Sequence, residues 1–154
     1  MRLTVIAVGR LKAGPERALV DDYAKRAAQT GRAIGFPSVS EVEVDNGGGV
    51  NAEGAKLLAK IPKGARAFRL DENGEAIGSA ALAKSLGAWR DAGERDLVWL
   101  IGGAEGYSDD VKRAAPNALA FGPQTWPHRL VRVMAFEQLY RAVSILAGAP
   151  YHKT

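Results

Sequence analysis

Cysteine is absent from this chain of 154 residues, and histidine and methionine occur only twice each. Without thiols the protein can form no disulfide, no thiolate metal site and no cysteine nucleophile. The two imidazoles, His128 and His152, stand too far apart in the sequence to make a metal site by themselves. We therefore expect no bound metal, and the absence of cysteine fits a cytoplasmic protein.

Long apolar runs are also missing. No stretch approaches the roughly 20 apolar residues of a membrane helix, and the first residues, MRLTVIAVGRLKAG, lack the cleavage site of a signal peptide. The 47% hydrophobic and 25% charged content is that of an ordinary globular protein. We expect one domain over residues 1–154 and no membrane partner. The net charge of +4 is by itself weak evidence for nucleic-acid binding.

What the sequence does contain is a regular alternation of short apolar runs and helical patterns. It predicts strands at residues 3–8, 38–45, 65–71, 96–103 and 118–122. It predicts helices at residues 15–31, 52–60, 79–93, 107–115 and 129–147, with Ser79 and Ser108 as N-caps, and a mobile glycine-rich loop at 46–51. This order predicts an α/β fold with one mostly parallel sheet and helices on both faces.

Three of the strands are followed by unusual turns. GGAEG, with Gly102, Gly103 and Gly106, exposes backbone groups to a ligand, although a tight turn with positive φ explains the same glycines equally well. GPQTWP is a rigid loop, and DENGEAIG, after Leu70, fits a plain polar turn. Ligands bind beyond the carboxyl ends of parallel strands. The motifs GxGxxG after the first strand and GxxxxGK[ST] are absent, which argues against the usual dinucleotide and triphosphate sites.

The last helix begins with cations, although the positive end of the helix dipole disfavours them. His128, Arg129 and Arg132 all lie there. At about 100° per residue, Arg132 falls inside the apolar arc, where it either extends out to solvent or points at an anion. A second apolar set lies on the other side of the helix: Leu130, Met134 and Ile145. A helix that is apolar on two sides has two neighbours, and we expect its own sheet and a second subunit.

Three stretches resemble those of a known family: LIGGAEG, WPHRLVRVMAFEQLYRA and the terminal APYHK. The chain resembles the SPOUT methyltransferases, and more closely the small single-domain subfamily that methylates ring nitrogen three of a pseudouridine in 23S ribosomal RNA. The likeness is dense over residues 97–153. Further upstream, the order of strands and the LD at Leu70 and Asp71 agree, but little else does.

The resemblance implies a C-terminal trefoil knot, which composition alone could not indicate because knots are very rare. It also implies S-adenosylmethionine as cofactor, bound in a bent shape by the loops of the knot. Carried over by position, the cofactor-binding residues are Leu70, Gly102, Gly103, Phe121, Gly122, Pro123, Gln124, Thr125 and Trp126. An adenine and a sulfonium require backbone partners and an apolar slot, which glycines and a proline-pinned loop can supply.

The resemblance further implies a homodimer with a composite site. A helix over residues 129–147 is about 28 Å long at ~1.5 Å per residue, so His128 and His152 meet more easily across a two-fold axis than within one chain. The implied catalytic residues are His128, Arg132, Tyr151, His152 and Lys153. Either histidine could take the ring proton, and Arg132 or Lys153 could hold the developing anion. The sequence does not divide these roles. His128 could equally be a loop histidine bonded to backbone, and Tyr151 a contact that pins the terminus.

The expected partner is 23S ribosomal RNA within the assembled ribosome, because such a small enzyme has no separate RNA-binding domain and must recognise shape and phosphates. One alternative is a non-catalytic ribosome-binding module with the same fold. Another is a small Rossmann-type oxidoreductase, which VGRLKAGPE after the first strand disfavours because it carries no dinucleotide motif.

Overall fold

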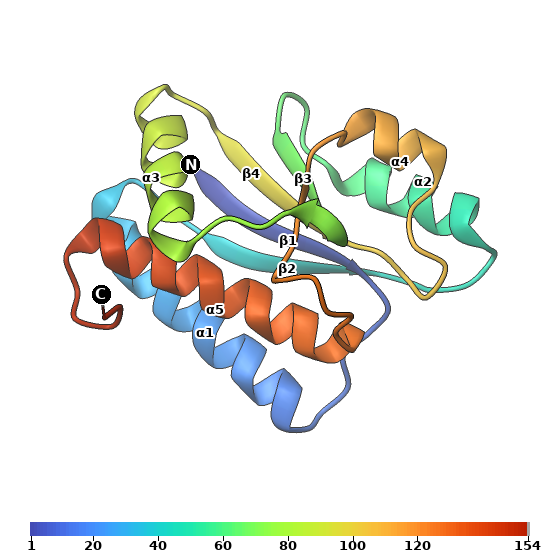
Figure 1. The fold of residues 1–154 in the computed structure, drawn as a ribbon, viewed down its shortest axis with the longest axis horizontal. Helices are drawn as coiled ribbons and strands as arrows, with labels where there is room; N and C mark the ends of the chain where they lie inside the picture. The colour runs from blue at the N-terminus through green and yellow to red at the C-terminus, as the bar shows by residue number, and fades with distance from the viewer. Residues whose placement is uncertain (154) are drawn as a thin grey trace.

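The computed structural model describes residues 1–153 as alternating strands and helices (Figure 1). The strands are β1 (Arg2–Val8), β2 (Val39–Val44), β3 (Arg66–Glu75), β4 (Asp96–Ile101) and β5 (Ala118–Leu119). The helices are α1 (Pro15–Gly31), α2 (Val50–Lys60), α3 (Ser79–Asp91), α4 (Asp109–Ala114) and α5 (His128–Ala147), with a short 3-10 helix at Arg32–Ile34. No helix in this part of the chain is long and apolar enough to cross a membrane.

The sheet has the order β2-β1-β4-β3-β5, and every pairing in it is parallel. Helices α1, α3 and α5 pack on one face, and the shorter α2 and α4 pack on the other (Figure 1). The predicted α/β class, with a parallel sheet and helices on both faces, is confirmed. Since all strands run the same way, their carboxyl ends share one edge, and the turns after β3, β4 and β5 meet there.

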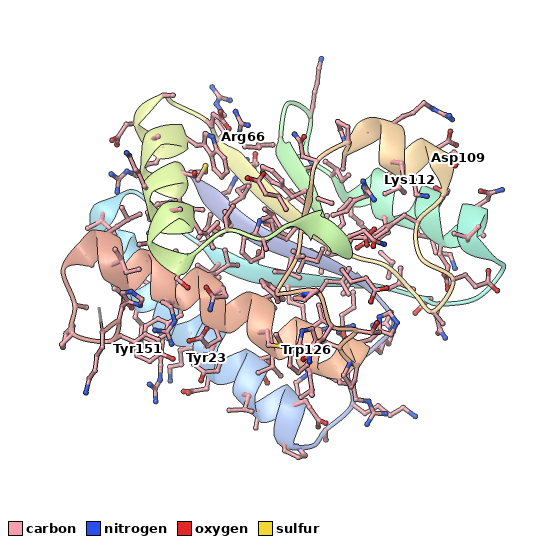
Figure 2. All side chains as sticks on the ribbon, viewed as in Figure 1. Tyr23, Arg66, Asp109, Lys112, Trp126 and Tyr151 are labelled. Atoms are coloured by element: carbon pink, nitrogen blue, oxygen red, sulfur yellow. The ribbon has the colours of Figure 1, made fainter. Side chains whose placement is uncertain are left out.

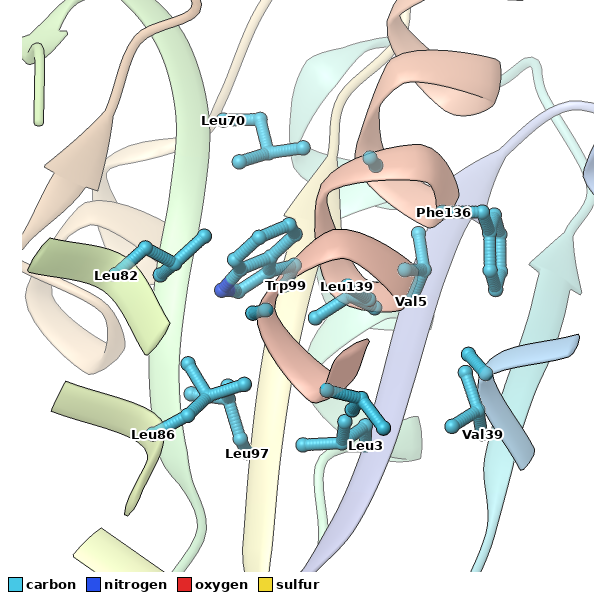
Figure 3. Packing of buried hydrophobic residues seen from close by; sticks show 14 of the residues in the cluster. Leu3, Val5, Val39, Leu70, Leu82, Leu86, Leu97, Trp99, Phe136 and Leu139 are labelled. Atoms are coloured by element: carbon cyan, nitrogen blue, oxygen red, sulfur yellow. The ribbon is translucent and has the colours of Figure 1, made fainter. Parts of the chain in front are cut away.

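Side chains along the central strands point alternately to the two faces of the sheet, so each strand contributes to the hydrophobic core on both faces. In β4, Leu97, Trp99 and Ile101 face the larger cluster under α1, α3 and α5, and Val98 and Leu100 face the smaller one under α2 and α4. All six residues of β4 are buried, as expected for a central parallel strand. Figure 3 shows the larger cluster, with Trp99 between α3 and α5. The central strands are thus packed on both faces, and this packing holds their carboxyl ends in place.

Several predicted details differ from the structure, and the strands predicted to end at residues 103 and 122 end at Ile101 and Leu119. Ser79 is not an N-cap: Gly78 holds that position, and the Ser79 hydroxyl donates to Gln138 Oε1 (2.7 Å). The segment after Leu70 is not a plain turn, because β3 continues to Glu75. Helix α2 begins at Val50, inside the predicted glycine-rich loop. For Ser79 a tertiary contact, and for β3 its pairing with β5, overrides the local sequence pattern.

Candidate active site

A cavity of about 360 Å³ opens at the carboxyl ends of β3, β4 and β5. The structure brings eight of the nine predicted cofactor residues to its wall: Leu70, Gly102, Gly103, Phe121, Gly122, Gln124, Thr125 and Trp126. Pro123 stands in the same loop but is exposed and does not line the cavity. His128, at the start of α5, also reaches the wall. Sequence segments about fifty residues apart therefore build one site.

The glycines of this wall are required by close packing. A Cβ on Gly102 would lie 2.9 Å from the carbonyl oxygen of Gly106, and one on Gly103 would lie 2.7 Å from Glu53 Oε1. Gly106 has a φ of 78°, and its N–H donates to the Gly103 carbonyl (3.0 Å). The turn therefore presents main chain to the cavity, because packing leaves no room for a side chain at Gly102 or Gly103 and the positive φ favours glycine at position 106.

Tyr107 braces the floor of the cavity, a role that the sequence did not reveal. Its hydroxyl lies 2.7 Å from the Leu70 carbonyl and 2.8 Å from the Leu100 carbonyl, so it links the middle of β3 to the last residues of β4. Burial raises the pKa of the Tyr107 hydroxyl well above its usual range. The hydroxyl therefore remains a donor at neutral pH, and the two strands stay tied together.

The wall combines apolar surface with an excess of acidic side chains. The apolar part comes from Leu70, Ile101, Leu119, Phe121 and Val131. The charged part comes from Asp71, Glu72, Glu105 and Lys112. Asp71 is offset by Arg69 (3.3 Å), and Lys112 is the one ammonium at the wall among residues 1–153. In a protein of net charge +4, this cavity is suited to an apolar ligand that carries positive charge.

The loop between β5 and α5 forms the outer wall. Trp126 Nε1 donates to the Phe121 carbonyl (3.2 Å), which closes the loop on itself, and the Thr125 hydroxyl bonds to the Glu72 carboxylate across the cavity mouth. Figure 2 shows Trp126 beside the start of α5 and Lys112 on α4, and both residues line the cavity. The loop is thus held at both ends without regular structure.

Arg132, predicted to hold an anion, lies away from the cavity. Its guanidinium is 5% exposed and is paired with Glu43 Oε2 (2.6 Å) and Glu41 Oε2 (3.2 Å), and it also donates to the Gly9 carbonyl (3.1 Å). Arg17 completes the cluster by pairing with the same two glutamates. The structure therefore does not bring Arg132 together with His128, although both belong to the first turns of α5.

The C-terminal tail folds back onto the C-terminal half of α5. The Tyr151 hydroxyl donates to Glu137 Oε1 (2.9 Å), its ring lies 4.5 Å from that of Tyr140, and Arg141 Nη1 is 3.1 Å from His152 Nδ1. Lys153 is exposed. Figure 2 shows Tyr151 near Tyr23, remote from Trp126. Within one chain the tail residues and His128 stay apart.

A second cavity, of about 490 Å³, lies over the outer face of α5. Leu19 and Tyr23 of α1, Ile77 and the α5 residues Val133 and Met134 contribute its apolar lining. Leu19 and Leu130 are among the few exposed large apolar side chains, at 44% and 41%. Of the second apolar set on α5, Leu130 is exposed and Met134 lines this cavity, whereas Ile145 packs against the larger core cluster. No group of three or more potential metal ligands occurs among residues 1–153.

The sequence is similar to those of known methyltransferases. A family model described as "Predicted SPOUT methyltransferase" matches residues 1–152. A protein of Hyphomonas neptunium called "Ribosomal RNA large subunit methyltransferase H" is 63% identical over 153 residues, which is 99% of each chain. A protein of the same name from Dinoroseobacter shibae is 50% identical, again over 99% of each chain.

Two solved structures are more distant. The SpoU methyltransferase AviRb of Streptomyces viridochromogenes, in complex with AdoMet, is 12% identical with a TM-score of 0.42, over 95% of this chain and 58% of that one. The TrmH/SpoU tRNA-modifying enzyme of A. aeolicus is 16% identical with a TM-score of 0.45, over 98% and 81%. With TM-scores this low, neither likeness supports a conclusion. The family model and the full-length relatives are sufficient: the chain belongs to the SPOUT methyltransferase family.

Proposed function

We propose that this protein transfers a methyl group from S-adenosylmethionine to 23S ribosomal RNA, at ring nitrogen three of a pseudouridine, on the assembled ribosome. The observation that carries the proposal is the glycine-walled, acidic and partly apolar cavity at the carboxyl edge of the sheet. The names of the relatives that match the whole chain support the ribosomal RNA substrate. An enzyme with that substrate works in the cytoplasm, where ribosomes are.

The residues present fit this cofactor. An adenine requires an apolar slot and backbone hydrogen-bond partners, and the cavity offers Leu70, Leu119 and Phe121 beside the bare main chain of Gly102 and Gly103. A sulfonium carries positive charge, and Glu72 and Glu105 lie at the same wall. The trefoil knot that the family resemblance implies stays a prediction.

We further propose that the active unit is a homodimer in which the tail of one subunit completes the cavity of the other. Helix α5 runs from His128 to Ala147, about 30 Å at ~1.5 Å per residue, and the tail folds back along it only as far as Glu137, which lies about 14 Å from the start of the helix. Tyr151, His152 and Lys153 therefore reach a His128 only if a second subunit brings it. The apolar cavity over α1 and α5 is a suitable surface for that second copy.

When bound, S-adenosylmethionine supplies an electrophilic methyl group. The ring N–H of the target base must lose a proton, and we assign the general base to one of the two imidazoles, His128 or His152, because histidine takes this role most often. Tyr151 is unsuited, because burial raises the pKa of its hydroxyl above the usual range and the group stays protonated at neutral pH. Since Arg132 is already neutralised by Glu41 and Glu43, we assign stabilisation of the developing anion to Lys153.

The test is transfer of tritium from labelled S-adenosylmethionine to ribosomes that lack the modification, with 50S subunits and free 23S RNA in parallel. We expect label on a single 23S pseudouridine, in assembled ribosomes only, and loss of label with His128→Ala. Label on free RNA would contradict the ribosome requirement. If the cofactor binds but no substrate is labelled, the substrate or the activity has been assigned wrongly.

A further inference from the structure

Glu53, in the first turn of α2, carries a buried carboxylate directly behind the wall of the proposed cofactor cavity. Its side chain is 9% exposed. Oε2 accepts a hydrogen bond from the Gly47 N–H (2.8 Å). Oε1 lies so close to Gly103 that a Cβ there would stand 2.7 Å from it. Only the main chain of Gly103, with no side chain, separates this carboxylate from the cavity.

Burial of a carboxylate is costly unless a cation or several hydrogen bonds offset it. Glu53 has no ion-pair partner among residues 1–153, whereas Glu41, Glu43 and Glu94 each pair with an arginine. Its one hydrogen bond comes from a backbone amide in the exposed glycine-rich loop. The neighbouring cavity already holds more carboxylates than ammonium groups. The structure thus holds a carboxylate without a cationic partner behind Gly103.

We propose that Glu53 is a specificity-determining residue that makes the cavity favour the cationic methyl donor over its neutral product, an inference that rests on the proposed function. S-adenosylmethionine carries a sulfonium, which becomes an uncharged thioether in S-adenosylhomocysteine once the methyl group has left. The amino and carboxylate groups of the two ligands are the same. A fixed carboxylate behind a wall without side chains therefore attracts the donor more than the product. The charge would promote release of the product and entry of the donor.

The substitution that separates charge from shape is Glu53→Gln. The amide has the size of the carboxylate, and its oxygen can still accept from the Gly47 N–H, but it has no charge. The matched control is Asp91→Asn, which removes the same charge from a largely exposed residue at the end of α3, just before β4 begins. That residue lies near the opposite edge of the sheet from the cavity, because β4 ends at the cavity.

The experiment is calorimetric titration of the purified full-length protein and both variants with three ligands. They are S-adenosylmethionine, S-adenosylhomocysteine and sinefungin, a cationic analogue with an amine in place of the methylsulfonium. We expect Glu53→Gln to weaken binding of both cationic ligands about three- to tenfold and to change that of S-adenosylhomocysteine less than about twofold. Asp91→Asn should leave all three affinities unchanged, and thermal melting should show that both variants fold.

Equal weakening of all three ligands by Glu53→Gln would overturn the inference, because it would make Glu53 a support of the loop rather than a source of charge. Unchanged affinities would overturn it as well. Failure of the proposed function gives a different result, since the unsubstituted protein would then bind none of the three ligands. The two failures are therefore distinguishable in the same titrations.

Discussion

Arg132 and three other charged side chains form a cluster of two arginines and two glutamates that joins three elements. Arg17 comes from α1, Glu41 and Glu43 come from β2, and Arg132 comes from the start of α5. Glu43 Oε2 also accepts from the Leu11 N–H (2.6 Å). The cluster fixes the first turns of α5 against the ends of β1 and β2. It thereby also positions His128 and Val131, which line the cavity on those turns.

This arrangement predicts that Arg132→Met destabilises the fold. Two partly buried carboxylates would lose a cation, which costs about 3 kcal/mol of the free energy of unfolding for a buried pair. Urea unfolding at pH 7 measures the change. Arg129→Met is the control, because Arg129 is exposed one turn earlier and its loss should leave stability within about 0.5 kcal/mol. A stable Arg132→Met that had lost RNA binding instead would restore the anion-holding role expected from the sequence.

At the scale of elements, Ser108 shows how a local signal positions a wall of the site. Its hydroxyl accepts from the Val111 N–H (3.2 Å) at the start of α4, the short helix that carries Lys112. Gly54 of α2 packs against it so closely that a Cβ there would stand 2.3 Å from Ser108 Oγ. The cap thus both starts α4 and fits it against α2.

Loss of this cap has a predictable cost. Ser108→Ala should lower the free energy of unfolding by about 1 kcal/mol, because the Val111 N–H loses its partner in a buried position. The matched control is Ser79→Ala, whose hydroxyl bonds to Gln138 and caps no helix, so a smaller loss is expected. Chemical denaturation compares the two. Equal losses would show that α4 does not depend on its cap.

The order of elements could be predicted from periodicity because each strand and helix buries a regular face. Helix α1 has the bounds that its proline and glycine indicated, and Ser108 caps α4 as expected. The prediction of Ser79 as an N-cap was wrong because its hydroxyl bonds to Gln138 of α5, about sixty residues away in sequence. Angle alone placed Arg132 in an apolar arc but could not reveal Glu41 and Glu43 beside it. Contacts between distant segments are what the sequence pattern leaves out.

The residues of the candidate site also fall into two groups, those that the sequence could indicate and those that only tertiary packing reveals. Backbone positions such as Gly102 and Gly103 carry a local signal, and family resemblance identified the loop that ends at Trp126. Glu53 and Tyr107 carry none. Glu53 stands in an ordinary helical pattern, and Tyr107 stands beside a turn. Their positions behind and beneath the cavity follow only from the packing of α2 and α4 on the sheet.

At the scale of the whole molecule, the two sets of proposed catalytic residues lie at different places along α5. His128 lines the cavity at its start, and the tail with Tyr151 and His152 folds back onto Glu137 and Arg141 in its C-terminal half. The cavity over α1 and α5 leaves an apolar surface between them. A two-fold dimer that covers this surface would place two such helices beside each other, since symmetric dimers use the same patch on both subunits. Each site would then take one wall from each chain.

Mixing two inactive variants tests this assembly directly. His128→Ala and His152→Ala should each abolish methyl transfer as pure dimers, while both stay folded. In a mixed dimer, one site combines the intact loop of the second variant with the intact tail of the first, and the other site carries both defects. Subunit exchange at equal concentrations should therefore restore roughly a quarter of the activity of the unsubstituted protein, since half of the dimers are mixed and each has one complete site. Sedimentation confirms that the mixture is dimeric. If loop and tail act within one chain, no mixed dimer has a complete site, and activity stays absent at every mixing ratio.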